Sequence, residues 1–321
     1  MATLLTDLLP ELKYPIIMAP MFLVSTNELL IEARKHGITG AIPALNYRTT
    51  DDLEKGIKDL QARCEGPFGI NLIVNKSNIY YKQQLEICCR LQVDYIITSL
   101  GSPEETIKKA HHSGVKVFCD VTDLKFAKKV EALGADAVIA VNKNAGGHAG
   151  ELSAKALITE IKTHCNIPIL SAGGVGDYEG VQQMLALGAA GLSIGTVFMA
   201  SNEASISGEY KQALVDYSSK DIVMTTKLSG TPCTVINTPY VQKIGTDQNF
   251  LEKLLNKNKR LKKWLKAFTF YKGMKSLQNA AFSTTYKTVW CAGPSVDYTK
   301  EIRPLKEIIK ELTQPTPQNN G

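Results

Sequence analysis

The sequence lacks several features that would assign it to whole classes of protein. None of its apolar runs approaches the roughly 18 residues of a transmembrane helix. The first residues contain no basic stretch followed by an apolar one, so we expect neither secretion nor membrane insertion. The seven cysteines form no C-x-x-C pair and no zinc-type spacing with histidine. This pattern predicts reduced thiols, no metal site and a cytoplasmic protein.

A strong charge of either sign is also missing. The chain has 37 Lys and Arg against 31 Asp and Glu, a formal net charge of +6 concentrated in residues 253–275. Such a mild balance gives little support to a nucleic-acid partner. No dinucleotide fingerprint occurs either, because the G-x-G that begins at Gly174 fails at Glu179.

What the sequence does contain is a repeating unit: a helical pattern, a glycine where the helix would end, and a short apolar run. A glycine after a helix followed by a buried strand is typical of α/β units. Gly37, Gly114, Gly134 and Gly188 hold this position. The predicted strands are 16–18, 40–42, 68–73, 95–98, 115–119, 137–141, 169–171 and 191–194.

Eight βα units in about 220 residues predict an α/β fold of the (β/α)8 TIM-barrel type, with the barrel in residues 1–225. A doubly wound open sheet is the alternative, because it too alternates strand and helix. That alternative needs a phosphate loop after its first strand, and residues 18–21 contain no glycine.

The loop at 144–150 reads Asn-Ala-Gly-Gly-His-Ala-Gly and directly follows a predicted strand. Its histidine, His148, can exchange protons near neutral pH, and its glycines leave room for a flat ligand. This combination predicts a catalytic loop, and the alternative is a glycine-rich turn with a solvent-facing histidine.

Two further glycine turns, at 172–175 and 195–196, follow the seventh and eighth predicted strands. TIM barrels commonly hold a phosphate there, bound by exposed backbone amides. The alternative for the first turn is a tight connection to a helix capped by Asp177.

Six segments, in order, resemble the flavin-dependent nitronate monooxygenases, once called 2-nitropropane dioxygenases, and their relatives the FMN-dependent enoyl-acyl-carrier-protein reductases. The segments are 15–21, 68–72, 145–148, 168–174, 194–196 and 229–232. The resemblance implies a TIM barrel that binds FMN, with His148 as its functional histidine. It also implies a cofactor site made of Ala19, Pro20, Met21, Asn71, Gly147, Gly150, Gly173, Gly174, Ser193, Gly195 and Thr196.

One position departs from the family pattern. The family usually carries a glutamate where this chain has Asn144. Loss of a carboxylate changes the local charge by one unit, which affects substrate preference or redox tuning more directly than cofactor binding.

The resemblance implies FMN-dependent oxidation of alkyl nitronates by O₂, with His148 as the acid or base. One alternative is an enoyl-acyl-carrier-protein reductase that takes hydride from NADH or NADPH. Another is a flavin-binding protein that has lost catalysis, as the change at Asn144 would allow. Among other polar residues, Asp120 and Thr122 are expected at the barrel mouth without an assigned role, and the remaining histidines are expected at helix ends.

Residues 226–321 are predicted to form a loop and a lysine-rich helical appendage packed over the barrel mouth. Leucines and lysines between 251 and 268 alternate at helical spacing. The main interpretation is a helix packed on the barrel with a solvated lysine face. The alternatives are a lid over the flavin, or a surface for an acidic carrier protein under the reductase hypothesis.

Overall fold

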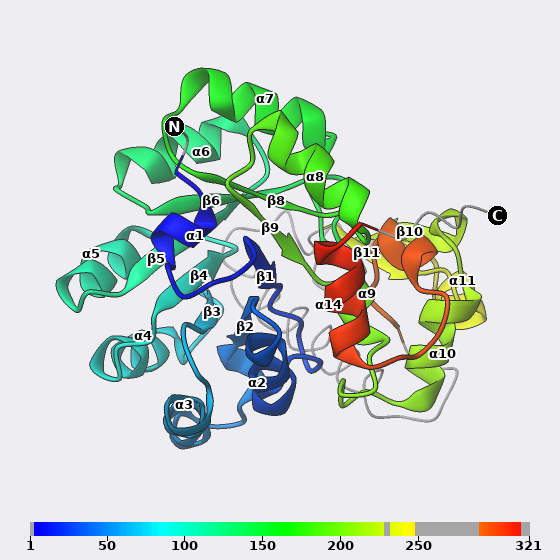
Figure 1. The fold of residues 1–321 in the computed structure, drawn as a ribbon, viewed down its shortest axis with the longest axis horizontal. Helices are drawn as coiled ribbons and strands as arrows, with labels where there is room; N and C mark the ends of the chain where they lie inside the picture. Colours follow the sequence, from blue (N-terminus) through cyan, green and yellow to red (C-terminus); the bar gives the residue numbers. More distant parts are fainter. Residues whose placement is uncertain (1–2, 228–231, 248–288, 316–321) are drawn as a thin grey trace.

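Eight parallel strands close into a barrel in the computed structural model, which describes residues 3–227, 232–247 and 289–315 (Figure 1). The strands follow each other around the barrel in chain order, and the last pairs with the first, Ile16 lying opposite Leu192. They are β1 Ile16–Met18, β2 Thr39–Pro43, β3 Gly69–Ile73, β4 Tyr95–Ser99, β5 Lys116–Val121, β6 Ala137–Val141, β8 Ile169–Ala172 and β9 Gly191–Ile194. The predicted TIM barrel is therefore confirmed, and the open sheet is excluded.

Helices form the outer layer around the barrel. They are α2 Asn27–Lys35, α3 Thr50–Arg63, α4 Tyr81–Arg90, α5 Glu104–His112, α6 Leu124–Ala132, α7 Ala154–His164 and α8 Tyr178–Leu187. Side chains of Thr26, Thr49, Asp123 and Ser153 cap four of these helices by accepting a backbone N–H. All four glycines predicted after helices have positive φ, as a left-handed helix end requires.

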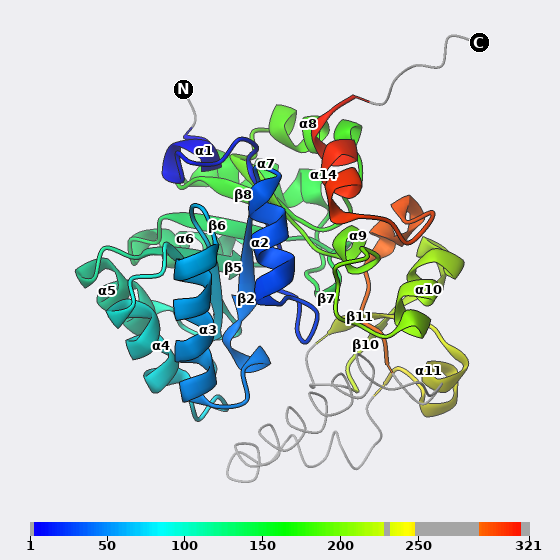
Figure 2. The same ribbon diagram turned by 60° about the horizontal axis from the view of Figure 1, so that its bottom comes forward.

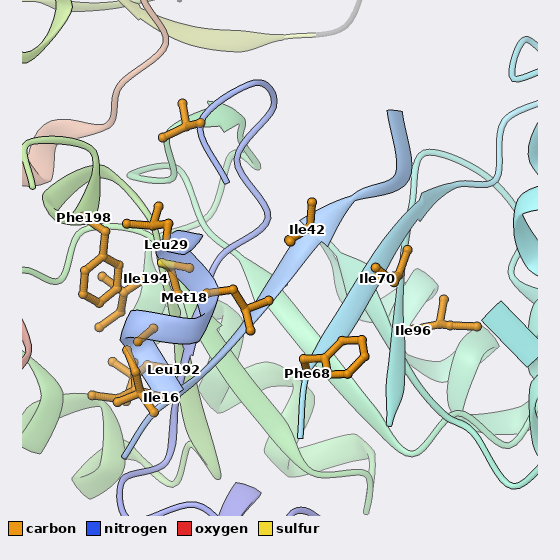
Figure 3. Close-up of a cluster of buried hydrophobic side chains, with 14 of the residues drawn as sticks. Ile16, Met18, Leu29, Ile42, Phe68, Ile70, Ile96, Leu192, Ile194 and Phe198 are labelled. Atoms are coloured by element: carbon orange, nitrogen blue, oxygen red, sulfur yellow. The ribbon is translucent and has the colours of Figure 1, made fainter. Parts of the chain in front are cut away.

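The core has two parts because side chains alternate along each strand. Inside the barrel lie Ile17, Tyr95, Ile97 and Phe118, with the rings of Tyr95 and Phe118 stacked at 5.0 Å. Between strands and helices lies the outer cluster, in which Figure 3 labels Ile16, Met18, Leu29, Ile42, Phe68, Ile70, Ile96, Leu192, Ile194 and Phe198. The short helix α1, Leu5–Leu8, adds buried Leu5 at the amino-terminal end of the barrel.

The final helix, α14 Leu305–Thr313, packs against both α8 and α2. Leu305, Ile308, Ile309 and Leu312 form its buried face. Residues from the predicted appendage therefore belong to the outer helical layer of the barrel (Figure 1). The boundary at 225 itself stays a prediction.

A second, three-stranded antiparallel sheet lies at the carboxyl-terminal end of the barrel (Figure 2). Its order is β10 Ile222–Thr225, β11 Cys233–Ile236 and β7 Gly147–His148. The other described elements are α9 Thr196–Met199, α10 Gly208–Asp216, α11 Pro239–Ile244 and the 3-10 turns Ala44–Asn46, Ser219–Asp221 and Pro294–Tyr298. The predicted lysine-rich helix at 251–268 lies outside the described residues. Within the described part of the chain, no helix is long and apolar enough to cross a membrane.

Candidate active site

A cavity of about 1190 Å³ opens at the carboxyl-terminal ends of the barrel strands. Small-molecule sites usually measure roughly 300–1,000 Å³, so this one can hold a nucleotide together with a small substrate. The predicted site residues all line it: Ala19, Pro20, Met21, Asn71, Gly147, His148, Gly150, Gly173, Gly174, Ser193, Gly195 and Thr196. The barrel thus brings these distant positions together, while their individual roles stay predictions.

The glycine turn after β8 is held tightly against the loop that follows β6. Gly173 has φ +111°, and a Cβ there would lie 2.4 Å from the backbone N of Ala145. Asn142 donates to Gly173 O at 3.0 Å and accepts from the backbone N–H of Asn144 at 2.8 Å. The cap predicted at Asp177 is confirmed by its bond to Gly180 N at 2.8 Å. This turn therefore has a structural role and also lines the cavity.

Gly195, between β9 and α9, has a different environment. Its φ is −122°, which any residue adopts, and a Cβ there would lie 3.5 Å from Ala19 Cβ, an ordinary contact. The protein itself therefore leaves room for a side chain at this position. An open glycine position at the wall of the cavity fits a flavin phosphate held by backbone amides.

His148 lies in a strand, whereas the sequence indicated only a loop. In β7 it pairs with Cys233 of β11, and the hydroxyl of Thr234 donates to Ala145 O at 2.7 Å. Burial lowers the pKa of His148. The ring is therefore neutral at pH 7 and able to accept a proton.

Two thiols beside His148 were not expected in the site. Cys233 and Cys291 both line the cavity, with their sulfur atoms 3.7 Å apart. The hydrogen bond between Cys291 and Cys233, together with burial, raises the pKa of Cys291 well above its usual value. The thiol of Cys291 therefore stays protonated at neutral pH and is a poor nucleophile.

Another titratable group of the cavity is Asp120, near the end of β5. It accepts a hydrogen bond from Ser99 Oγ at 2.5 Å, and Ser99 accepts one from Asn71 Nδ2 at 2.8 Å. Burial raises the pKa of Asp120 to about 6, against the opposing effect of the Ser99 hydrogen bond. Sequence reasoning missed Ser99, although its spacing of two from the inward-facing Ile97 could have identified it.

This buried carboxylate should cost stability at high pH. Asp120→Asn is expected to stabilise the flavin-free protein by roughly 2–3 kcal/mol at pH 8 and to change little at pH 4. At pH 4, close to the unfolded pKa of 3.8, the carboxyl is protonated in the folded state and about half protonated in the unfolded state, so little free energy separates them, whereas above about pH 6 the folded state holds a charge away from water. Urea unfolding at both pH values measures the difference. An equal gain at pH 4 and pH 8 would contradict the assignment.

The other histidines lie at helix ends, as predicted. His36 contacts Glu32 at 3.1 Å, His111 contacts Asp136 at 2.8 Å, and His164 bonds Glu160 O at 2.9 Å. His148 is thus the histidine among the described residues that lines the cavity.

Comparison with known families agrees with this geometry, because the family model for nitronate monooxygenase matches residues 74–315. The chain belongs to the nitronate monooxygenase family. It is accordingly a flavin-dependent oxidoreductase, and the resemblance noted in the sequence is confirmed.

Several individual proteins, and one solved structure, are similar to the chain over most of its length. A probable nitronate monooxygenase of Staphylococcus saprophyticus is 29% identical, over 76% of this chain and 81% of that protein. A (3aS,4S,5R,7aS)-5-hydroxy-7a-methyl-1-oxo-octahydro-1H-indene-4-carboxyl-CoA dehydrogenase of Rhodococcus jostii is 29% identical, over 77% and 69% respectively. The structure of FabK from Thermotoga maritima has 30% identity and a TM-score of 0.83, covering 96% of this chain and 94% of that one.

Proposed function

We propose that this member of the nitronate monooxygenase family binds FMN and oxidises alkyl nitronates with O₂. The observation that carries the proposal is the placement of His148, with its neutral ring, in the same cavity as the glycine turns after β8 and β9. FMN has one phosphate and one ring system. The glycine turns offer a place for the phosphate, and the apolar wall that includes Ala19 and Met21 offers a surface for the ring.

The bound flavin supplies a two-electron acceptor, and the residues of this chain supply position and proton transfer. His148 accepts the α-proton when the substrate enters as a neutral nitroalkane, and it orients the anion when the substrate enters as a nitronate. Backbone amides around Gly195 hold the phosphate, as the resemblance implies. Pairing of β7 with β11 keeps His148 at a fixed position relative to these groups.

An enoyl reductase that uses NADH or NADPH is the second candidate, favoured by the similarity to FabK over nearly the whole chain. Its acidic carrier-protein partner belongs only to this alternative. Its substrate would need room for an acyl chain, and the cavity volume is compatible with that as well.

Two assays on the purified, flavin-loaded protein separate the candidates. We expect O₂ uptake with a pre-formed alkyl nitronate in the absence of any nicotinamide, and no oxidation of NADH or NADPH with a crotonyl thioester. The reverse result would establish the reductase. Bound flavin with neither activity would favour a protein that has lost catalysis, in line with the change at Asn144.

A further inference from the structure

Three polar side chains occupy neighbouring strands at the carboxyl-terminal end of the barrel. Asn71 lies in β3, Ser99 ends β4 and Asp120 lies in β5, strands that are adjacent in Figure 1. All three positions lie on the inward-facing side of their strands. Ser99 and Asp120 lie two residues beyond the inward-facing Ile97 and Phe118, and Asn71 lies opposite Ile97 in the pairing of β3 with β4. All three line the cavity.

The hydrogen bonds between them can run in one direction only. Asn71 Nδ2 donates to the backbone oxygen of Ile97 at 3.2 Å, and a carbonyl oxygen can only accept, so the amide nitrogen must face this side. The second N–H of Asn71 goes to Ser99 Oγ at 2.8 Å. Ser99 therefore accepts from Asn71, and its own hydrogen goes to Asp120 Oδ2.

This direction leaves the amide oxygen of Asn71 as the group of that side chain with no donor among residues 3–227, 232–247 and 289–315. Among the described residues, none donates a hydrogen bond to Asn71 Oδ1. A flipped amide would place that oxygen against the oxygen of Ile97, which is repulsive. We call the hydrogen bonds from Asn71 through Ser99 to Asp120 the relay. The relay and the bond to Ile97 therefore both hold the Asn71 amide in one orientation.

In the part of the chain that the structure describes, the surroundings of Asp120 give no other reason for a carboxylate. The neighbouring strand β6 faces it with Ile139 and Val141, both apolar, and β4 offers Ser99. Among the described residues no cation pairs with this carboxylate, so keeping an acceptor there is costly and points to a functional requirement for the acceptor oxygen.

We propose that Asp120, through Ser99, orients the Asn71 amide so that its oxygen accepts a hydrogen bond from an N–H group of the flavin ring. Asp120 and Ser99 are thereby positioning residues. The inference rests on the proposed function for its cofactor, and it does not depend on which substrate is oxidised.

The matched substitutions separate the acceptor from the charge. Asp120→Leu removes the acceptor and Ser99→Ala removes the relay, and each should raise the Kd for FMN about tenfold, the loss expected for one hydrogen bond. Asp120→Asn keeps an acceptor oxygen without the charge and should stay within about threefold of the wild type. The measurement is quenching of FMN fluorescence on titration with flavin-free protein, together with the visible spectrum of the bound flavin.

The spectrum distinguishes positioning from mere stability. We expect the flavin absorption bands of Asp120→Asn to coincide with those of the wild type, and those of Asp120→Leu and Ser99→Ala to be shifted. Asp94→Leu is the control, because Asp94 lies at the opposite end of the barrel and accepts from Phe68 N at 2.9 Å. This variant should lower thermal stability while leaving the affinity and spectrum of the folded protein unchanged.

Several outcomes would overturn the proposal. If Asp120→Asn binds FMN as weakly as Asp120→Leu, FMN affinity depends on the charge of Asp120 and not on its role as a hydrogen-bond acceptor in the relay. Unchanged affinity in all variants, or an equal loss in Asp94→Leu, removes the positioning role. A wild type that binds no FMN overturns this inference together with the proposed function, whereas the expected binding pattern without nitronate oxidation overturns the proposed function alone.

Discussion

His148→Ala is expected to retain FMN and to lose about 10²–10⁴-fold in kcat/KM toward a neutral nitroalkane, the usual contribution of a positioned base. A pre-formed nitronate has already lost the proton, so only one hydrogen bond to a charged group is removed. That loss is about 1.5–3 kcal/mol, or roughly one to two decades in rate. The backbone pairing of residue 148 with Cys233 does not depend on the side chain, so the fold should persist.

The measurement is kcat/KM for both substrate forms between pH 5 and pH 9, with flavin content determined in every preparation. Because burial lowers the pKa of His148, the wild-type rate with the neutral nitroalkane should decline only below the ordinary histidine pKa of 6.5. His111→Ala, at the end of α5, is the matched control and should behave as the wild type. Equal, small losses in kcat/KM for both substrate forms would show that His148 is not the base. Loss of FMN from His148→Ala would show that His148 serves cofactor binding instead.

Gly195→Ala should weaken FMN binding by roughly one to two decades while leaving the flavin-free protein as stable as the wild type. The added methyl makes ordinary contacts with Ala19 and Met21, so the protein accepts it. A phosphate held against the same backbone has no such room, and overpacking of this kind costs about 1–3 kcal/mol. Equilibrium titration with FMN and thermal unfolding of the flavin-free protein measure the two effects separately.

Gly173→Ala is the informative comparison. Residue 173 has positive φ and would clash with the backbone of Ala145, so this variant should lose stability and flavin together. Gly174 also has positive φ, which makes a substitution there equally ambiguous. Full retention of FMN by Gly195→Ala would show that the phosphate lies elsewhere.

The barrel could be predicted from the sequence because its signals are local. A helix end at a left-handed glycine and an apolar run a few residues later mark each unit, and the predicted strands differ from the observed ones by at most two residues at either end. β5, for example, was predicted at 115–119 and spans Lys116–Val121. The cavity followed from the fold, because parallel strands of a closed barrel bring their carboxyl ends to one place.

What could not be predicted depends on contacts between distant segments. His148, in a barrel loop, pairs with Cys233, which lies beyond the predicted barrel boundary at residue 225. A strand of two residues is too short for any local sequence pattern to predict. Cys291 reaches the cavity from still further along the chain. The relay from Asn71 to Asp120 required the register between β3, β4 and β5, which periodicity alone does not supply.

The position of α14 bears on the order in which a ribosome-bound chain could become active. All eight barrel strands are present once residue 194 has been made, yet the surfaces of α2 and α8 that contact α14 are covered only when Leu305–Thr313 follows. The strand that fixes His148 also emerges about forty residues after the barrel is complete. Non-local contacts of this kind form late and slowly. A nascent barrel would therefore have to persist with the apolar faces of α2 and α8 uncovered, and His148 would take its place in β7 only after β11 has been made.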